Sequence, residues 1–577
     1  MMRKKQGALL AAAVMLLSMS GCARIQQTSG YLDEQAAPYA WKPEHAKETT
    51  AAVPAMTTTM TTTTTTTQLT GPEFSELPLE VPYLDMQTVS FTMQAEDLEL
   101  PPAFVESNEL AGYTGSGYVS GLQGELNNTI VFQAEIPYSQ HYDISLIACT
   151  DMGAECTLLV NDTEISSIAI EGSGKFISAT APGIYMDAGV NTISIRQESG
   201  DMYLDCMEFA NNTSLIPNRY ITTESCNPDA SPEARRLLAF LGENYGQKMV
   251  SGQHAEDSSN GEIIRIVETT GKFPAIRFAD MYPYSGNGGD PENAEVIADC
   301  LQWAEQGGIV GLMWHWYAPM GEATVFTEEA DFNLYNAVTY EDVVMASPAE
   351  LQEMYENGAI SEECLRLIED IDTVSLALKA LCDAEVPVLW RPLHQAGGGL
   401  YWWDSAGSDV YLWLWNLLHE RMVEYHQLNN LVWVWNGLDT AYLPSGAYYD
   451  IASADVYTDE KQEFGSGYEA YYALQEMAEG KILALSECSS LPDVTTAFRD
   501  GSVWSYFGLW YEPYLSGEDN EYTDSETLIA VYNSEGVLTR EDYIEYCKQY
   551  GADAEETVYT PTEALNWQDG GMYYEEW

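Results

Sequence analysis

Basic side chains are scarce in this chain of 577 residues. Only 24 Lys and Arg stand against 89 Asp and Glu, which gives a formal net charge of −65 at pH 7. Proteins that bind nucleic acid neutralise its phosphates with clustered Lys and Arg. The shortage of basic residues therefore excludes nucleic acid, and polyanions in general, as partners.

Cysteine is also sparse, with 10 residues and no pair in C-x-x-C spacing. We therefore expect neither a zinc site nor a dense disulfide framework. Aromatic residues, by contrast, are abundant, with 15 Trp and 38 Tyr. Core packing accounts for most of them, but flat rings also bind the faces of sugars.

The only apolar stretch near the start of the chain is short. Basic residues, MMRKK, precede an apolar run from Ala8 to Leu17, which is too short to span a bilayer. Small residues then lead directly to Cys22, and Met19-Ser20-Gly21-Cys22 resembles a bacterial lipobox. We expect residues 1–22 to be a lipoprotein signal peptide. Cys22 would anchor the exported protein to the cell membrane, facing the extracellular side, and this lipid anchor would be its only membrane contact. The alternative is an ordinary secretory signal.

The sequence predicts no folded domain at either end of the chain. Residues 23–80 are polar, and threonine fills nearly every position from 57 to 67. Such a segment cannot bury a core, so we expect a disordered tether. Residues 553–577 form an acidic C-terminal tail.

Residues 85–215 consist of short alternating runs broken by Gly, Asn and Asp. The spacing predicts an antiparallel β-sandwich. The runs are VSFTMQAEDL, NTIVFQAEI, YDISLIACT, CTLLVND, GVNTISIRQ and MYLDCMEFA. With QAED near the start and LDCMEF at the end, this region resembles carbohydrate-binding modules of the family 6 and 35 type. The resemblance implies a structural calcium held partly by Glu96 and Asp205; alternatively, both are ordinary solvated charges.

Residues 228–552 alternate apolar runs with segments of helical period. Eight runs occur in order, which predicts a (β/α)8 TIM barrel, an α/β fold. Asp290-Pro291 predicts the start of one helix and Gly307 its end, and Gly480 predicts the end of another. The runs are KMVSGQH, PAIRFAD, GIVGLMWHW, PVLWRPLH, LVWVWN, IASADVY, KILALSE and SYFGLW.

Polar or aromatic residues stand at the carboxyl ends of these predicted strands, where TIM-barrel active sites lie. Three of the seven histidines are among them. In chain order the residues are His254, Asp280, His315, His394 with Gln395, Asp455 with Tyr457, Glu487 and Trp510. We expect these side chains to converge on one site.

The segment from Pro387 to Asp404, PVLWRPLHQAGGGLYWWD, resembles the signature around the acid/base residue of glycoside hydrolase family 26, the β-mannanase family. The resemblance implies a retaining glycosidase that needs no cofactor, with Glu487 as nucleophile after the seventh strand and Tyr457 as its hydrogen-bond partner. It also implies a substrate site, for which the candidates are His254, Asp280, His315, Arg391, His394, Trp402, Trp403, Tyr457 and Trp510. We expect Trp402 and Trp403 to form flat walls beside the bound sugar.

The chain departs from this signature at the acid/base position, where Gln395 replaces the usual glutamate. An amide cannot donate the proton that a leaving group needs, and loss of a general acid costs about 10²- to 10⁴-fold in rate. Leu400 and Asp404 are further departures, and Asp404 is a candidate substitute acid.

These observations lead to three hypotheses. The first is a glycoside hydrolase resembling endo-1,4-β-mannanases, with weak or lost activity, acting on β-mannan or a related plant polysaccharide. The second is a non-catalytic mannan-binding protein of the cell surface. The third is the same fold acting on xylan or mixed-linkage glucan.

Overall fold

The computed structural model describes residues 79–80, 87–100, 102–122, 129–215, 220–458, 465–478, 480–511, 514–515 and 522–549. The predicted signal peptide with Cys22, nearly all of the tether and the acidic tail lie outside these residues. Within the described part, every helix is too short or too polar to cross a bilayer.

Residues 90–211 form the predicted antiparallel sandwich. One sheet has the strand order β5-β10-β7-β8, and the other has β3-β4-β11-β6-β9, with β2 also paired to β11. The strands are β2 Ser90–Gln94, β3 Val105–Ser107, β4 Tyr118–Leu122, β5 Thr129–Ile136, β6 Gln140–Cys149, β7 Ala154–Val160, β8 Thr163–Ile170, β9 Phe176–Met186, β10 Gly189–Ser199 and β11 Met202–Asn211. Alternate residues of β5, from Ile130 to Ile136, are buried in the core between the sheets. Outside the sandwich, β1 (Leu79–Glu80) pairs with β12 (Tyr220–Ile221).

The sandwich contains four strands that the sequence pattern did not reveal, namely β3, β4, β8 and β9. Half of the residues of β8, TEISSIAI, are polar, and only Ile168 and Ile170 of it are buried. Its hydrophobic alternation is therefore too weak to be read as a strand.

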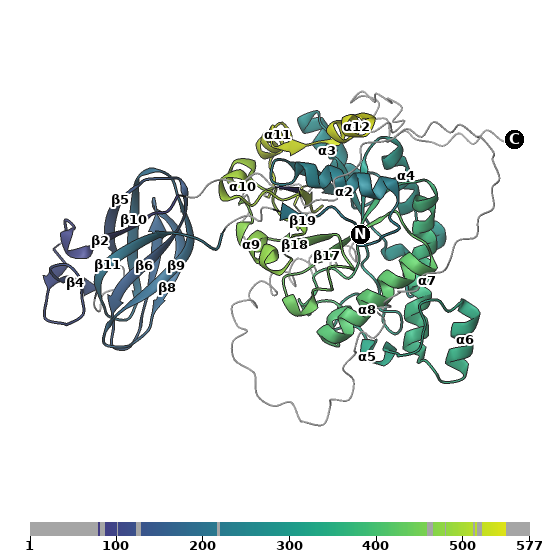
Figure 1. The fold of residues 1–577 in the computed structure, drawn as a ribbon, viewed down its shortest axis with the longest axis horizontal. Helices are drawn as coiled ribbons and strands as arrows, with labels where there is room; N and C mark the ends of the chain where they lie inside the picture. Colours follow the sequence, from purple (N-terminus) through teal and green to yellow (C-terminus); the bar gives the residue numbers. More distant parts are fainter. Residues whose placement is uncertain are drawn as a thin grey trace, which may run out of the picture. The chain divides into compact units, whose positions relative to one another are not determined.

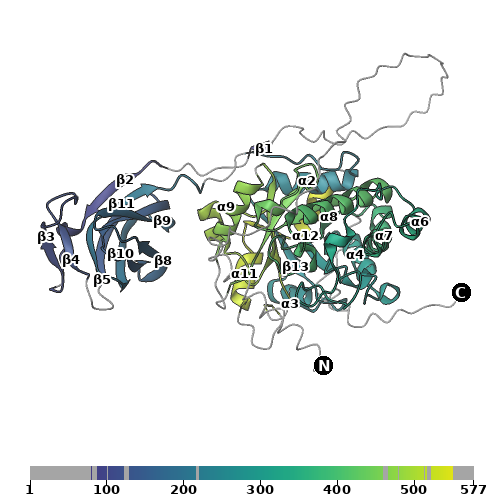
Figure 2. The ribbon, with the colours of Figure 1, turned by 90° about the horizontal axis from the view of Figure 1, so that it is seen from below.

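The C-terminal region confirms the predicted barrel. Eight parallel strands form a closed ring because β13 pairs with both β14 and β20. They are β13 Met249–His254, β14 Ile276–Asp280, β15 Ile309–Met313, β16 Val388–Arg391, β17 Leu431–Asn436, β18 Ile451–Val456, β19 Ile482–Cys488 and β20 Tyr506–Leu509. Each strand lies in one of the eight apolar runs, except that β19 extends one residue beyond its run, to Cys488. The helices surround these strands (Figures 1 and 2), and the short strand β21 (Val537–Leu538) pairs with β13.

Several helices begin at side chains that accept hydrogen bonds from exposed backbone N–H groups, whereas α3, α4, α8 and α9 have no such cap. Ser231, Ser347, Ser361, Asp493 and Asp524 cap α2, α6, α7, α10 and α11. The helices are α2 Pro232–Asn244, α3 Gly261–Thr270, α4 Val296–Glu305, α5 Leu334–Ala337, α6 Pro348–Glu356, α7 Glu362–Asp383, α8 Ser408–Glu420, α9 Tyr468–Met477, α10 Val494–Asp500, α11 Ser525–Tyr532 and α12 Arg540–Gln549.

One predicted helix start is wrong. Asp290-Pro291 opens only the 3-10 turn η3 (Pro291–Asn293), and α4 begins at Val296. The carboxylate of Asp290 accepts hydrogen bonds from the side chain of Asn293, so it does not cap a helix. The predicted ends hold more closely, since α4 ends at Glu305 and α9 at Met477, two and three residues before Gly307 and Gly480.

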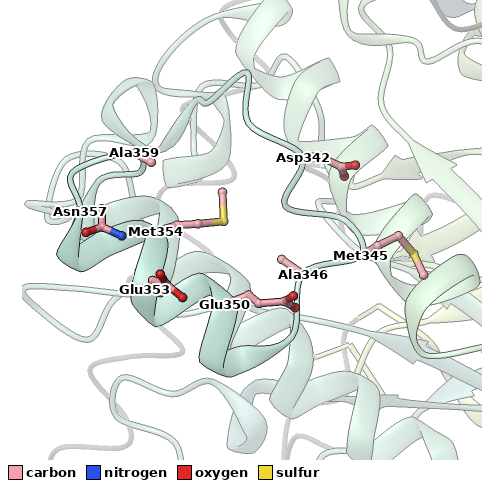
Figure 3. Close-up of a pocket in the computed structure, with 8 residues that line it drawn as sticks. All are labelled: Asp342, Met345, Ala346, Glu350, Glu353, Met354, Asn357 and Ala359. Atoms are coloured by element: carbon pink, nitrogen blue, oxygen red, sulfur yellow. The ribbon is translucent and has the colours of Figure 1, made fainter.

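The long segment between β15 and α7 is fastened by a buried arginine. Arg421 donates hydrogen bonds to the carbonyls of Val343, Val344 and Ala346, and it forms an ion pair with Asp372 at 2.6 Å. Residues 342–359 of this segment line a surface hollow of about 490 Å³, into which Met354 projects from α6 (Figure 3). None of the strand-end residues lines it.

Candidate active site

The site lies at the carboxyl ends of the barrel strands, where parallel strands present their last side chains together. The structure brings together all the strand-end residues that the sequence singled out. They follow or end β13 to β16 and β18 to β20.

Glu487, on β19, is the most tightly held carboxylate of this group. It is 1% exposed. Its Oε1 forms a short ion pair with Arg391, and its Oε2 accepts a hydrogen bond from the Tyr457 hydroxyl at 2.6 Å. Burial alone would raise the pKa of Glu487, but Arg391, His254 and Tyr457 outweigh it and hold the pKa below its ordinary value. The carboxylate is therefore ionised at neutral pH.

Arg391, on β16, holds two carboxylates at once. Its guanidinium pairs with Glu487 and lies 3.3 Å from the carboxylate of Asp455 on β18. The sequence predicted that Arg391 contacts substrate; instead, its charge is buried between these two acids. Its effect on a bound sugar is therefore indirect, through the position and charge of Glu487.

Gln395 follows β16 with a backbone φ of 56°, in the left-handed region that costs about 1 kcal/mol or more for a residue with a side chain. Asn436, at the end of β17, holds this conformation, because its Oδ1 accepts the Gln395 N–H at 2.7 Å. The amide Nε2 of Gln395 donates to Oδ2 of Asp455 at 3.1 Å. Residue 395 is therefore fixed through both its backbone and its side chain.

Asp455 is surrounded by donors and by a second negative charge. Its Oδ1 accepts a hydrogen bond from the Asn436 amide at 2.8 Å. Burial, and then the charge of Glu487, raise the pKa of Asp455 to about 7, although Arg391, Gln395 and Asn436 oppose this shift. Glu487 and Asp455 thus titrate far apart, with Glu487 the one that ionises first.

A chain of polar contacts connects three further strand ends. The Nδ1 of His315 lies 2.7 Å from Oδ2 of Asp280, and its Nε2 lies 3.2 Å from Nε2 of His394. Burial would lower the pKa of His315, but Asp280 raises it above its ordinary value. Burial and then the charge of His315 keep the pKa of His394 well below its usual range. A protonated His315 therefore donates to Asp280 on one side and to neutral His394 on the other.

His254 is a supporting residue rather than a sugar ligand. Its ring stacks on Phe278 with centroids 4.6 Å apart and lies 4.7 Å from Trp510. Its Nε2 hydrogen bonds to the carbonyl of Ser486, the residue before Glu487, at 2.9 Å. Burial lowers the pKa of His254 to about 4, so the ring is neutral at physiological pH.

The prediction for Trp402 and Trp403 is wrong, because both side chains are completely buried. Trp402 donates its indole N–H to the carbonyl of Trp316 at 2.6 Å, and Trp403 donates to the carbonyl of His394 at 3.1 Å. Their neighbour Tyr401 is closer to the site, with its hydroxyl 3.4 Å from Nε2 of His315. The 3-10 turn of residues 402–404 directs the two indoles into the core.

Sequence reasoning missed Tyr401 and Asn436. Asn436 is the polar residue that ends the fifth apolar run, LVWVWN, so the rule that found the other strand ends also points to it. Tyr401 belongs to an aromatic cluster in which pattern alone does not distinguish core rings from site rings.

Asp404 is turned toward the glycine loop. Its Oδ2 accepts the Gly399 N–H at 3.0 Å. Burial raises the pKa of Asp404 to about 7, and the nearby carboxylate of Asp439 adds to the shift. In the described part of the chain, no recorded contact joins Asp404 to Gln395 or Glu487, so a role as substitute acid would require the loop to rearrange.

The two predicted calcium ligands lie close together in the sandwich. Oε1 of Glu96 accepts the Ser116 N–H at 2.8 Å, while its Oε2 is buried without a protein partner. Asp205 accepts the Thr114 N–H at 3.0 Å, and burial followed by the charge of Glu96 raises the pKa of Asp205. The described residues contain no group of three or more His, Cys, Asp or Glu side chains placed to hold a metal. Two carboxylates with amide and hydroxyl oxygens nonetheless suit calcium, which binds neutral oxygens readily.

Comparison with known proteins gives consistent results for both regions. Residues 226–542 match glycosyl hydrolase family 26, and residues 93–211 match the carbohydrate binding module of family 35. A mannan endo-1,4-β-mannosidase of Thermothelomyces thermophilus is 32% identical over 80% of this chain and 92% of its own length. Mannan endo-1,4-β-mannosidase A of a Piromyces species is 31% identical over 78% of this chain and 72% of its own. The crystal structure of a Podospora anserina GH26-CBM35 β-(1,4)-mannanase is similar, with a TM-score of 0.60 and 29% identity, over 79% of this chain and 99% of that one.

The raised pKa of Asp404 predicts how the free energy of unfolding should change with pH. Between about pH 4 and pH 7 the unfolded chain loses this proton while the native state keeps it, so ionisation favours unfolding as the pH rises. Asp404→Asn cannot ionise, so its free energy of unfolding should fall less between pH 5 and pH 8 than that of the wild type, by at most about 2.7 kcal/mol. Urea unfolding followed by tryptophan fluorescence measures this difference. The exposed Asp331→Asn variant is the control, and equal pH dependence in all three proteins would contradict the assignment.

Proposed function

The chain belongs to glycosyl hydrolase family 26, and from that premise we propose that its barrel acts on β-mannan by a retaining mechanism with Glu487 as nucleophile. The observation that carries this proposal is the buried, ionised carboxylate of Glu487 at the end of β19, held by Arg391 and Tyr457. The names of the relatives support mannan as the substrate.

In this mechanism the Glu487 carboxylate attacks the anomeric carbon while the bond to the leaving oxygen breaks, which gives a glycosyl-enzyme ester. Water then attacks the same carbon and releases Glu487. Arg391 and Tyr457 keep the carboxylate oriented before the attack and stabilise it when it departs. Gln395 can neither protonate the leaving oxygen nor deprotonate the water, so the leaving oxygen takes its proton from bulk water and the attacking water gives one up to bulk water, without a positioned acid or base.

A second candidate function, non-catalytic binding of β-mannan, is favoured by one observation. The amide of Gln395 supplies Asp455 with a hydrogen bond at 3.1 Å, so the site is ordered without a carboxyl group at residue 395. Hydrolysis of xylan or mixed-linkage glucan is the third candidate. A reducing-sugar assay on mannan, glucomannan, xylan and lichenan separates the three.

Gln395→Glu should restore general acid catalysis. A carboxyl group in place of the amide would face Asp455 at hydrogen-bonding distance, and two carboxyls so close must share a proton, which keeps residue 395 protonated near neutral pH. Turnover of mannan should rise by up to about 10²- to 10⁴-fold. The pH profile of the variant should gain an alkaline limb that the wild type lacks, because the new acid must be protonated.

Glu487→Ala should abolish activity in both backgrounds, and it is the control for contaminating enzymes. Substrates with a dinitrophenyl leaving group should be cleaved by the wild type, since that group departs without a proton. Intact mannan binding with no gain from Gln395→Glu would support the binding protein instead. Full wild-type turnover of mannan would mean that another group donates the proton.

For the sandwich we propose that Glu96 and Asp205 hold a calcium ion and that the domain binds sugar. The buried Oε2 of Glu96 and the proximity of Asp205 support a cation at this position. Calcium would offset the repulsion between the two carboxylates and link the start of the domain to β11.

Removing calcium should therefore destabilise the sandwich. A ligand that binds only the native state stabilises it by about 2.7 kcal/mol at 100 times its dissociation constant, and chelation removes this contribution. Calorimetry of the full chain should show that a calcium chelator lowers the Tm of one transition. Asp205→Asn should lower the Tm of the same transition without chelator. The exposed Glu135→Gln variant is the control and should behave like wild type. A Tm indifferent to chelator would remove the calcium proposal.

For localisation we propose that Cys22 carries a lipid and holds the protein on the outer face of the cell membrane. The basic start, the short apolar run and the small residues before Cys22 support this proposal. In the native host, Cys22→Ala should remove the incorporated lipid label and shift the protein out of the detergent phase on phase partitioning. Unchanged partitioning and labelling would contradict the anchor.

A further inference from the structure

We propose that the glycine loop of residues 397–399 is a clamp on the leaving-group side of the barrel mouth, and that Asp404 is the positioning residue that holds it closed. This inference rests on the function proposed above, because it concerns the half of the mouth that would receive the departing part of the sugar chain. It assigns a role to one of the positions at which the chain departs from the family signature.

The glycine loop lies beside residue 395, the acid/base position of the signature. Gln395, with its partners Asn436 and Asp455, occupies the half of the mouth formed by β16, β17 and β18. The loop is connected directly to this residue, since the Gly398 N–H donates to the carbonyl of Gln395 at 3.0 Å. In a retaining mechanism the leaving oxygen departs beside the acid/base position. The loop therefore borders the sugars on that side of the cleaved bond.

The chain is attached to its neighbours at both ends of the loop. Before the loop, the Ala396 N–H donates to the carbonyl of Asn436 at 3.0 Å, and after it the carbonyl of Leu400 accepts the Thr327 N–H at 2.9 Å. The glycines between these two points are loosely packed, because a Cβ atom added at Gly399 would meet no other atom within 4 Å. Their position therefore depends on the hydrogen bonds of their N–H groups.

Asp404 binds these N–H groups. Its Oδ2 accepts the Gly399 N–H at 3.0 Å. Burial raises the pKa of Asp404, and hydrogen bonds from the N–H groups of Gly399, Gly397 and Gly398 oppose the rise. The φ angles of Gly397 and Gly399 are 84° and 71°, and successive N–H groups in such a turn form a concave site for a carboxylate. The carboxyl group, in a residue only 5% exposed, thus fastens all three glycines.

The proton on Asp404 determines how firmly the clamp is closed. With the loop closed, burial and the carboxylate of Asp439 raise the pKa of Asp404 to about 7. If the loop moved away, the carboxyl group would gain solvent, and its pKa would return toward the ordinary value of about 4. The closed loop therefore binds the proton more tightly than the open loop. Its stabilisation is complete below about pH 4 and is lost as the pH rises to about 7.

Three titratable groups on two neighbouring elements face Asp404. Asp439 and Tyr442 belong to the 3-10 turn η6 (Thr440–Tyr442) and its N-cap after β17, and Tyr411 belongs to α8. Burial, and then the charge of Asp404, raise the pKa of both tyrosines, so they remain neutral where Asp404 titrates. Asp439 also touches the loop, because a Cβ atom at Gly397 would lie 2.7 Å from Cβ of Asp439. Among these three groups, Asp439 is therefore the one whose charge favours opening.

Hydrogen exchange of the full-length protein, followed by mass spectrometry between pH 5 and pH 8, measures closure of the clamp without requiring catalytic activity. The rates are first corrected for the pH dependence of chemical exchange. Peptides that contain residues 397–400 should then lose protection by up to about tenfold for each pH unit until about pH 7, and no further above it. Asp404→Asn has no proton to lose, so its protection should not change with pH.

Two further variants separate positioning from a general loss of structure. Asp439→Asn leaves Asp404 in place and keeps an oxygen for the Ala441 N–H, which Oδ1 of Asp439 accepts at 2.9 Å. Because this variant removes a neighbouring negative charge, its loss of protection should level off at a lower pH than in the wild type. Asp409→Asn, which changes an exposed carboxylate on α8, is the matched control and should behave like wild type.

The effect on substrate is measured by titration calorimetry with mannohexaose, a chain long enough to extend to both sides of the cleaved bond. All proteins carry Glu487→Ala to prevent turnover. The apparent affinity follows the fraction of molecules with a closed loop, so Kd should rise by about 2- to 10-fold between pH 5 and pH 8, and Asp404→Asn should abolish this rise. Asp455 also titrates near pH 7, and the sandwich is the same in both proteins, so the difference between them is the readout.

The possible failures differ from one another. Protection that depends on pH equally in the wild type and in Asp404→Asn would overturn the clamp, as would an unchanged profile in Asp439→Asn. Exchange as expected, with the same pH dependence of Kd in both proteins, would overturn the placement of the clamp at the substrate. No binding of mannohexaose at any pH would contradict the proposed function instead, and the exchange result would still decide whether Asp404 closes the loop.

Discussion

The buried guanidinium of Arg391 is the interaction on which the site depends. It contacts two carboxylates on adjacent strands, Glu487 and Asp455, and its single positive charge favours the ionised form of each. Removing one partner of such a group leaves an uncompensated buried charge, at a cost of about 3–5 kcal/mol. Arg391 also sets the order of ionisation, because its pairing is closer with Glu487, whose pKa falls, than with Asp455, whose pKa is about 7. The ionisation of Glu487, the proposed nucleophile, therefore depends on side chains from three strands, β16, β18 and β19.

The same arrangement explains how the site tolerates Gln395. A glutamic acid at that position would have to donate its proton to Asp455 or share it, since two ionised carboxylates at this distance repel each other. The amide of glutamine has the same shape and carries its own N–H donor, so it satisfies Asp455 at every pH. Glutamine at this position therefore leaves no unpaired buried group beside Asp455.

The fold could be predicted from sequence because its signals are local. Eight apolar runs matched eight strands, and the residues that end them converge because parallel strands end on one face. The positions of Trp402 and Trp403 could not be predicted in this way. Trp402 and Trp403 follow the glycines in a motif that suggests an exposed platform, yet the 3-10 turn of residues 402–404 directs both indoles into the core. Likewise, the sequence places Arg391 at a strand end but does not reveal that two carboxylates occupy its guanidinium. The first outcome depends on a local turn, and the second depends on partners that are 64 and 96 residues away in the chain.

The division of the barrel mouth into two halves follows from the same contacts. On one side, amide groups of Gln395 and Asn436 are bound to Asp455, so the polar groups there are directed at one another. On the other side, Asp280 and His315 retain solvent exposure beneath tyrosine rings. The side chain of residue 395 contacts only the first half. The contacts of Asp280 and His315 therefore do not depend on whether residue 395 carries a carboxyl group or an amide, and the second half can keep its arrangement in a barrel without a proton donor at this position.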